Sequence, residues 1–132
     1  MALGSLAVDT LNTSTGVLAT QNGMTGIAKA WVNFNGTLSG TITPRDSFNV
    51  GSVTKNGTGD YTINFTTAMP NANYCWLGIA KGIDGAFNYN YPSVGNRFTT
   101  LPATTSIRVG TAYQGGSVST DFDYVYVAVF SS

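Results

Sequence analysis

The sequence predicts an all-β protein, a compact antiparallel β-sandwich of the jelly-roll type with roughly seven to nine strands. Apolar and polar residues alternate with a period of two along several segments, which is typical of strands with one buried face. Glycine, at 16 of 132 residues, combines with many Asn, Ser and Thr residues to place turn signals about every eight to twelve residues. No stretch shows the helical period. We therefore expect one sandwich domain over residues 27–132, preceded by a separate segment, residues 1–26.

Residues 1–26 alternate only loosely and hold too few apolar residues for a core of their own. The apolar positions at the start of this segment are Leu3, Leu6, Val8 and Leu11. We expect residues 1–26 either to add an edge strand to the sheet or to reach out as an arm that docks on another protein.

The first predicted strand alternates clearly over residues 28–34. One face holds Ala28, Ala30, Val32 and Phe34. The opposite face holds Lys29, Trp31 and Asn33. The pattern predicts that the first set faces the core and the second faces away.

A hairpin is predicted around Asn56, Gly57 and Gly59, residue types that tolerate positive φ. Its second strand covers residues 60–66, with the apolar side chains Tyr61, Ile63 and Phe65 on one face. Its first strand is predicted as one run over residues 47–54. Met69-Pro70-Asn71-Ala72-Asn73 then interrupts the sheet, because proline cannot donate to a ladder.

Residues 74–79 are apolar on both faces, so we expect both faces to be covered and Cys75 to be a buried structural thiol. The next stretch, residues 82–96, is the least strand-like of the domain. Its aromatic and amide residues are Phe87, Asn88, Tyr89, Asn90 and Tyr91. They either fold back as a cap on the core or form a contact surface for a receptor.

Two further strands complete the predicted sandwich. In residues 106–113 Ile107, Val109 and Thr111 alternate with more polar neighbours. Residues 123–130 are apolar on both faces, which suits a central strand with both sides covered.

Composition excludes several classes of function. Charged residues make up only 9% of the chain, six Lys or Arg against six Asp, so there is no basic patch for nucleic acid. The longest apolar run is far shorter than the roughly 20 residues of a membrane span. We expect neither membrane insertion nor a signal peptide, and a single cysteine fits folding in a reducing cytoplasm.

The chain is predicted not to be an enzyme and to bind no cofactor or metal. It contains no histidine, so it lacks Ser-His and Cys-His pairs and an ordinary zinc site. Asp121 and Asp123 are the pair of carboxylates closest in sequence, and we interpret them as turn and edge residues rather than a glycosidase pair. Asp46 is expected to make a turn or an ion pair with Arg45 or with a neighbouring subunit.

Four segments, AKAWVNFNGT, DSFNV, NGTGDYTINFTTAMP and NANY, follow one another between residues 27 and 76. In this order and spacing they resemble a segment that recurs in bacteriophage virion proteins, mostly tail-fibre or other surface structural proteins. The resemblance implies a protein of the virion, made in the host cytoplasm and attached to other virion proteins. It leaves two roles open: a tail-fibre or spike tip that binds a host-surface glycan or protein, as a lectin-like module would, and a protein that decorates or cements the capsid.

The functional unit is expected to be a homo-oligomer. Low charge and strands that are apolar on both faces indicate surface that a partner covers. The candidate interface residues are Trp31, Tyr124 and Tyr126. The resemblance to phage surface proteins favours a trimer, and the rival explanation is that residues 1–26 and the 82–96 loop cover these faces within one chain.

Overall fold

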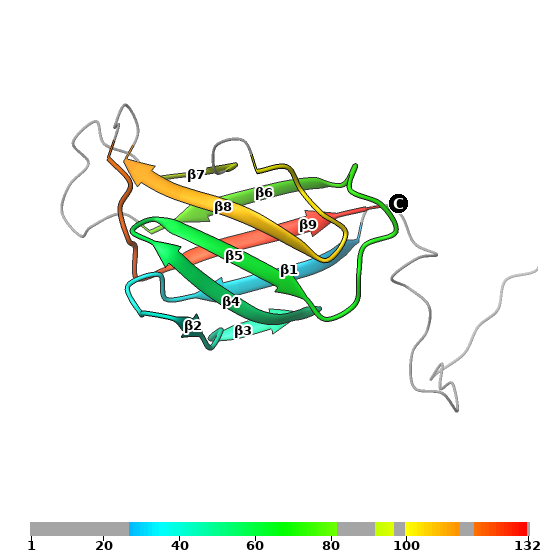
Figure 1. The fold of residues 1–132 in the computed structure, drawn as a ribbon, viewed down its shortest axis with the longest axis horizontal. Helices are drawn as coiled ribbons and strands as arrows, with labels where there is room; N and C mark the ends of the chain where they lie inside the picture. Colours follow the sequence, from blue (N-terminus) through cyan, green and yellow to red (C-terminus); the bar gives the residue numbers. More distant parts are fainter. Residues whose placement is uncertain (1–26, 82–91, 97–99, 114–117, 132) are drawn as a thin grey trace, which may run out of the picture.

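The computed structural model describes residues 27–81, 92–96, 100–113 and 118–131. Within these ranges the chain forms nine strands and no helix. The strands make two antiparallel sheets that lie one over the other, with their strands crossing at an angle (Figure 1). The predicted all-β sandwich is therefore confirmed.

The two sheets hold four and five strands. The four-stranded sheet has the order β3 (Asp46–Phe48), β1 (Ala28–Phe34), β9 (Val125–Phe130), β6 (Cys75–Ala80). The five-stranded sheet has the order β2 (Thr41–Ile42), β4 (Val50–Gly57), β5 (Asp60–Phe65), β8 (Ser106–Tyr113), β7 (Pro92–Asn96). As expected, β9 is a central strand, but its outer side is not covered by the described residues, since Tyr126 is exposed.

The core lies between the sheets and is built from the alternating positions that the sequence marks. Tyr61, Ile63 and Phe65 of β5 are buried, and they face the buried side chains of β1 and β9. The rings of Phe34 and Tyr61 meet edge to face with centroids 5.1 Å apart. Each such large side chain contributes about 1.5–3 kcal/mol through burial, so period-two alternation is the main source of stability in this fold.

The predicted single strand over residues 47–54 is wrong, because the chain changes sheets at Asn49. Asn49 has a φ of 55°, a conformation that asparagine tolerates better than most residues. Its side chain holds the corner: Nδ2 donates to the carbonyl oxygens of Lys29 and Thr67, and Oδ1 accepts from the Thr67 N–H. Residues 46–48 therefore pair with β1, and residues 50–57 pair with β5.

The predicted outward position of Lys29 is also wrong. The pairing of β1 with β9 shifts register between Ala28 and Ala30, which is a β-bulge. A bulge places two residues opposite one and re-aims their side chains. As a result Lys29 is only 2% exposed, while Trp31 keeps the outward position that the alternation assigns to it.

Residues 82–96 are not wholly irregular, since their last five residues form β7 at the edge of the five-stranded sheet. Proline is tolerated as the first residue of an edge strand, as Pro92 is here. On this margin of the sandwich β7 packs closely against β6 of the other sheet, where a Cβ at Gly78 would lie 2.8 Å from Val94 Cγ1.

Candidate functional site

The two outer faces of the sandwich differ sharply in chemistry. The outer face of the five-stranded sheet is polar, and its side chains form hydrogen bonds with one another. Asn64 Nδ2 donates to Ser52 Oγ (3.1 Å), and Asn56 Nδ2 donates to Thr62 Oγ1 (2.9 Å). The Arg108 guanidinium donates to both carboxylate oxygens of Asp60, at 2.9 and 2.7 Å. Such a network is typical of a surface that faces water.

The outer face of the four-stranded sheet is apolar instead. Five large side chains lie exposed on it: Trp31, Phe48, Leu77, Ile79 and Tyr126. Their exposed fractions run from 37% for Trp31 to 61% for Ile79. We call this surface the apolar face. None of the large apolar side chains that are exposed within the described ranges belongs to β2, β4, β5, β7 or β8.

Strand register arranges the apolar face in rows that cross all four strands. One row reads Phe48, Trp31, Ala128, Leu77 from β3 to β6. The adjacent row reads Asp46, Asn33, Tyr126, Ile79. Directly opposed residues point to the same side of an antiparallel pair, so each row is a continuous strip of surface.

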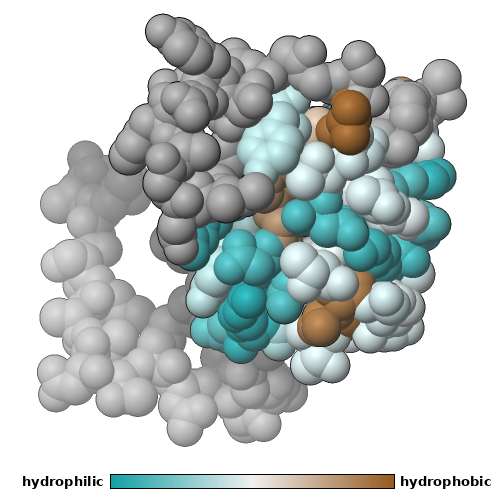
Figure 2. Space-filling model, turned by 90° about the vertical axis from the view of Figure 1, so that its left-hand side faces the viewer, coloured by the Kyte–Doolittle hydropathy of each residue, from teal (hydrophilic) through white to brown (hydrophobic). Residues whose placement is uncertain are grey.

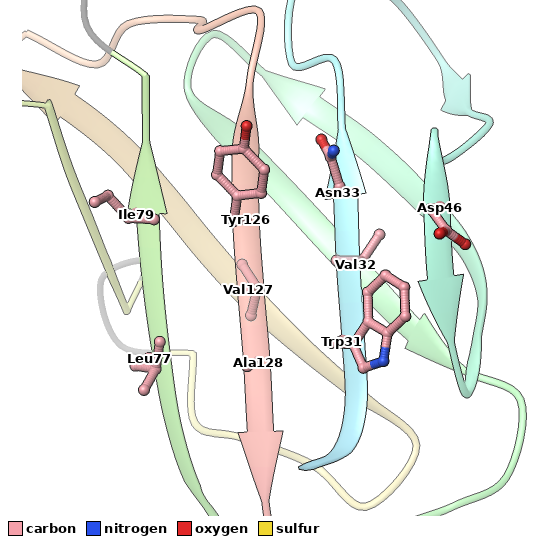
Figure 3. A pocket seen from close by; sticks show the side chains of 9 residues that line it. All are labelled: Trp31, Val32, Asn33, Asp46, Leu77, Ile79, Tyr126, Val127 and Ala128. Carbon is pink, nitrogen blue, oxygen red and sulfur yellow. The ribbon is translucent and has the colours of Figure 1, made fainter.

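A groove of about 360 Å³ runs over these rows, and its lining residues come from all four strands of the sheet (Figure 3). Four of the lining residues have polar side-chain atoms: Trp31, Asn33, Asp46 and Tyr126. Asn33 Oδ1 is buried and has no hydrogen-bond partner. Asp46 Oδ1 accepts the Ser47 N–H at 2.8 Å, and no lysine or arginine of the described ranges forms an ion pair with Asp46. Of the alternatives expected for Asp46, the ion pair with Arg45 is therefore wrong, and an ion pair with a neighbouring subunit stays a prediction.

Arg45 and Lys81 form a cationic end to the apolar face. The Arg45 guanidinium lies 3.9 Å from the centre of the Tyr124 ring and donates to the Asp123 carbonyl oxygen at 2.6 Å. Lys81 Nζ lies 5.4 Å from the same ring and 4.0 Å from Asp123 Oδ2. Tyr124 in turn stacks on Tyr126, with ring centroids 6.2 Å apart. Tyr124 thus contacts the two cations, and Tyr126, on which it stacks, lines the groove.

A second polar cluster, centred on Asp121, ties the β8–β9 connection to the β4–β5 hairpin. Asp121 Oδ1 accepts from the Gly59 N–H and the Tyr61 hydroxyl, each at 2.7 Å. Asp121 Oδ2 forms an ion pair with Lys55 Nζ at 2.6 Å. Burial by itself would raise the pKa of Asp121, but the Gly59 N–H, Lys55 and Tyr61 together outweigh burial and lower it. Burial and the Asp121 carboxylate raise the pKa of Tyr61.

We interpret the Asp121 cluster as structural. The end of the sandwich where the β4–β5 hairpin turns is shown in Figure 2, and its coloured surface is mostly hydrophilic with separated apolar spots. Asp121 and Asp123 both precede β9, which begins at Val125, two residues later than predicted. Nothing in the local sequence pattern indicates that Asp121 is the centre of a partly buried network. Within the ranges that the structure describes, no three His, Cys, Asp or Glu side chains are grouped to hold a metal ion.

The structure brings the three candidate interface residues, Trp31, Tyr124 and Tyr126, onto one face of the molecule. The candidate receptor residues Phe87, Asn88, Tyr89, Asn90 and Tyr91 lie outside the described residues. The prediction that Cys75 is buried is wrong, because its side chain is exposed. Leu77 and Ile79 share that side of β6 and are also exposed, so the residues that the structure describes leave this side of the strand uncovered.

Phe48 and the unpartnered Asn33 Oδ1 are functional candidates that sequence reasoning missed. The signal for Phe48 was available in the alternation of Asp46, Ser47 and Phe48, but it was hidden by treating residues 47–54 as one strand. The orphan acceptor of Asn33 carries no sequence signal at all.

Comparison with protein-family models, with curated proteins and with solved structures finds no match for this chain. The part of the chain that the structure describes contains no helix that is long and apolar enough to cross a membrane.

Proposed function

We propose that this protein is a non-enzymatic structural protein of a bacteriophage virion, a β-sandwich module on the particle surface. The resemblance of residues 27–76 to phage virion proteins supports a tail-fibre or spike tip, or a tail-associated protein. The alternative within the same proposal is a protein that decorates or cements the capsid. Its partners are other copies of itself and other virion proteins.

The observation that carries this proposal is the contrast between the two outer faces. One face has a self-satisfied network of amide, hydroxyl and ionic groups, whereas the other presents five large apolar side chains. A large apolar side chain has on the order of 200 Å² of surface, so these exposed fractions add up to roughly 500 Å². That is at the upper end of what soluble monomers expose and is a large part of the roughly 800 Å² that one partner buries in a stable interface.

The proposed unit is a homo-oligomer whose subunits meet through the apolar face, with Trp31, Tyr124 and Tyr126 in the interface. The resemblance favours three copies. In this arrangement the polar face points outward, and the function is assembly of the particle rather than chemistry.

We expect the purified protein to have a mass near three times 13.8 kDa in light scattering at micromolar concentration. Trp31→Asp is expected to lower that mass to a single chain, because it places a charge in the centre of an apolar contact. Thr41→Asp is the matched control, since Thr41 is an exposed strand residue at the edge of the other sheet, and its variant should keep the oligomer. A wild-type mass of one chain would reject the oligomer. It would favour the rival explanation, in which residues 1–26 and the 82–96 loop cover the apolar face within one chain.

Localisation of the protein on intact phage particles by cryo-electron microscopy tests the virion role itself. Density at the tail supports the tail-fibre or tail-associated role, and density over the capsid lattice supports decoration. Absence of the protein from purified particles would reject both.

A further inference from the structure

We propose that neighbouring copies contact through opposite margins of the apolar face. The β6 margin, Leu77, Ile79 and Lys81, packs against the β3 margin, Asp46 and Phe48, of the next copy. This inference rests on the proposed function in one respect: it requires the protein to assemble with itself.

The two margins have complementary chemistry. The β6 margin presents two aliphatic side chains, Leu77 (57% exposed) and Ile79 (61% exposed). The β3 margin presents the ring of Phe48 (41% exposed) in the same row as Leu77. Packing Leu77 on Phe48 of the next copy would remove both side chains from water, and the described part of a single chain leaves both exposed.

The charges of the two margins are also complementary. Lys81 follows β6 directly, and its backbone N–H donates to the Tyr124 carbonyl oxygen at 2.9 Å, so the ladder continues to this residue. Its side chain remains 44% exposed. Asp46, on the far margin, is an exposed carboxylate beside the groove. A contact between the margins would bring the Lys81 ammonium toward the Asp46 carboxylate, and apolar packing around this pair would reduce its screening by water.

Strand register limits how two copies can be related. A rotation about an axis parallel to the strands places the β6 margin of one copy on the β3 margin of the next and keeps the rows level. Leu77 then meets Phe48, and Lys81 lies one strand repeat, about 7 Å, from the level of Asp46, within reach of a lysine side chain. A two-fold axis across the strands would instead place each margin on itself, so that Asp46 faces Asp46 and Lys81 faces Lys81, and like charges repel each other.

Contacts between two different margins are heterologous, and they close into a ring when the rotation is a simple fraction of a turn. A threefold ring satisfies this condition and places Trp31, Asn33 and Tyr126, from the inner strands of each copy, around the axis. Both margins of every copy are then used, so no apolar margin is left exposed.

Charge reversal tests the ionic half of this contact. Asp46→Lys and Lys81→Asp are each expected to raise the dissociation constant of the oligomer at least tenfold, as measured by sedimentation. The double variant Asp46→Lys/Lys81→Asp should return to within about threefold of wild type, because the pair is restored with opposite polarity. Circular dichroism of each variant checks that the fold is retained. A double variant as weak as the product of the two single effects would overturn the proposal.

Cross-linking tests the apolar half and needs no assumption about charge. In a Cys75→Ser background, the double variant Phe48→Cys/Leu77→Cys should form covalent oligomers with a bismaleimide of about 10 Å span. Within one copy these positions lie three strand spacings apart, about 14 Å, so the reagent favours the contact between copies. Leu77→Cys alone should give no covalent dimer. Covalent dimers of Leu77→Cys alone, or an oligomer that the double variant does not cross-link, would reject the margin contact while leaving the proposed oligomer intact. A single-chain mass for the wild type would reject both.

Discussion

Replacing Gly59 by alanine is expected to lower the free energy of unfolding by about 3 kcal/mol or more. Gly59 turns the β4–β5 hairpin with a φ of 59°, a left-handed conformation that costs a residue with a side chain roughly 1–2 kcal/mol. A Cβ at this position would also overlap the Thr111 carbonyl oxygen and lie 2.8 Å from the Thr120 backbone nitrogen. Both atoms belong to backbone, which cannot rotate away as a flexible side chain could.

The effect is large because the Gly59 backbone is held from two sides. Its N–H donates to Asp121 Oδ1 at 2.7 Å, and its carbonyl oxygen accepts from the Thr111 N–H at 2.9 Å. Any shift of the turn that relieves the overlap would lengthen these two hydrogen bonds. The hairpin therefore cannot adapt without losing its attachment to β8 and to the β8–β9 connection.

Gly40 and Gly57 provide matched controls, and chemical denaturation of the three Gly→Ala variants measures the free energy of unfolding of each. Gly40 also has a positive φ, 68°, but open space where a Cβ would be, so Gly40→Ala should show only the conformational cost of about 1–2 kcal/mol. Gly57 has neither a positive φ nor a neighbour within 4 Å, so Gly57→Ala should change stability little. If Gly59→Ala lowers the free energy of unfolding no more than Gly40→Ala does, the close approach of Gly59 to Thr111 and Thr120 would be contradicted.

Asp121→Asn is expected to destabilise the protein by about 2–4 kcal/mol, because it breaks an ion pair and leaves partly buried donors poorly matched. The Asp121 carboxylate accepts from three donors, the Gly59 N–H, the Tyr61 hydroxyl and the Lys55 ammonium. An amide offers one acceptor oxygen and turns an N–H group toward one of these donors. Asp123→Asn is the control, since Asp123 is about half exposed and lies 4.0 Å from Lys81, and its loss should cost little.

The same carboxylate should make stability depend on acid. The folded protein lowers the pKa of Asp121 below its ordinary value of 3.8, so the folded state binds this proton less well than the unfolded state does. Its contribution is therefore fully present above that ordinary value and is lost as pH falls through the folded pKa. As the pH is lowered below about 4, we expect the midpoint concentration of denaturant to decrease in the wild type. The decrease should be less steep in Asp121→Asn. Parallel profiles for the two proteins would contradict this role of Asp121.

Much of the fold follows from local pattern. Alternation in residues 60–66 and 106–113 assigned the buried faces of β5 and β8 correctly, because in a strand the side-chain period alone decides which residues share a face. The glycine-rich turn at residues 56–59 and the break at residues 69–73 were also predicted from residue type. These features depend on backbone chemistry within a few residues, so no knowledge of distant contacts is needed.

The errors occur where distant backbone decides the outcome. The corner at Asn49 depends on Lys29 and Thr67, which are 20 and 18 residues away along the chain. The burial of Lys29 depends on a bulge opposite β9. The Asp121 cluster joins Lys55, Gly59 and Tyr61 across 60 to 66 residues of chain. None of these contacts leaves a periodic trace in the sequence.

The sequence by itself determined that this chain is a β-sandwich and that β6 and β9 are apolar on both faces. Only the tertiary structure decided which of those faces fills the core. Val125, Val127 and Val129 face inward, whereas Leu77, Ile79 and Tyr126 stand on the outside in rows with Trp31 and Phe48. The physical reason is that the alternation along a strand shows which residues share a face but not which strands lie next to it. A surface forms only when strands from distant parts of the chain lie side by side in register.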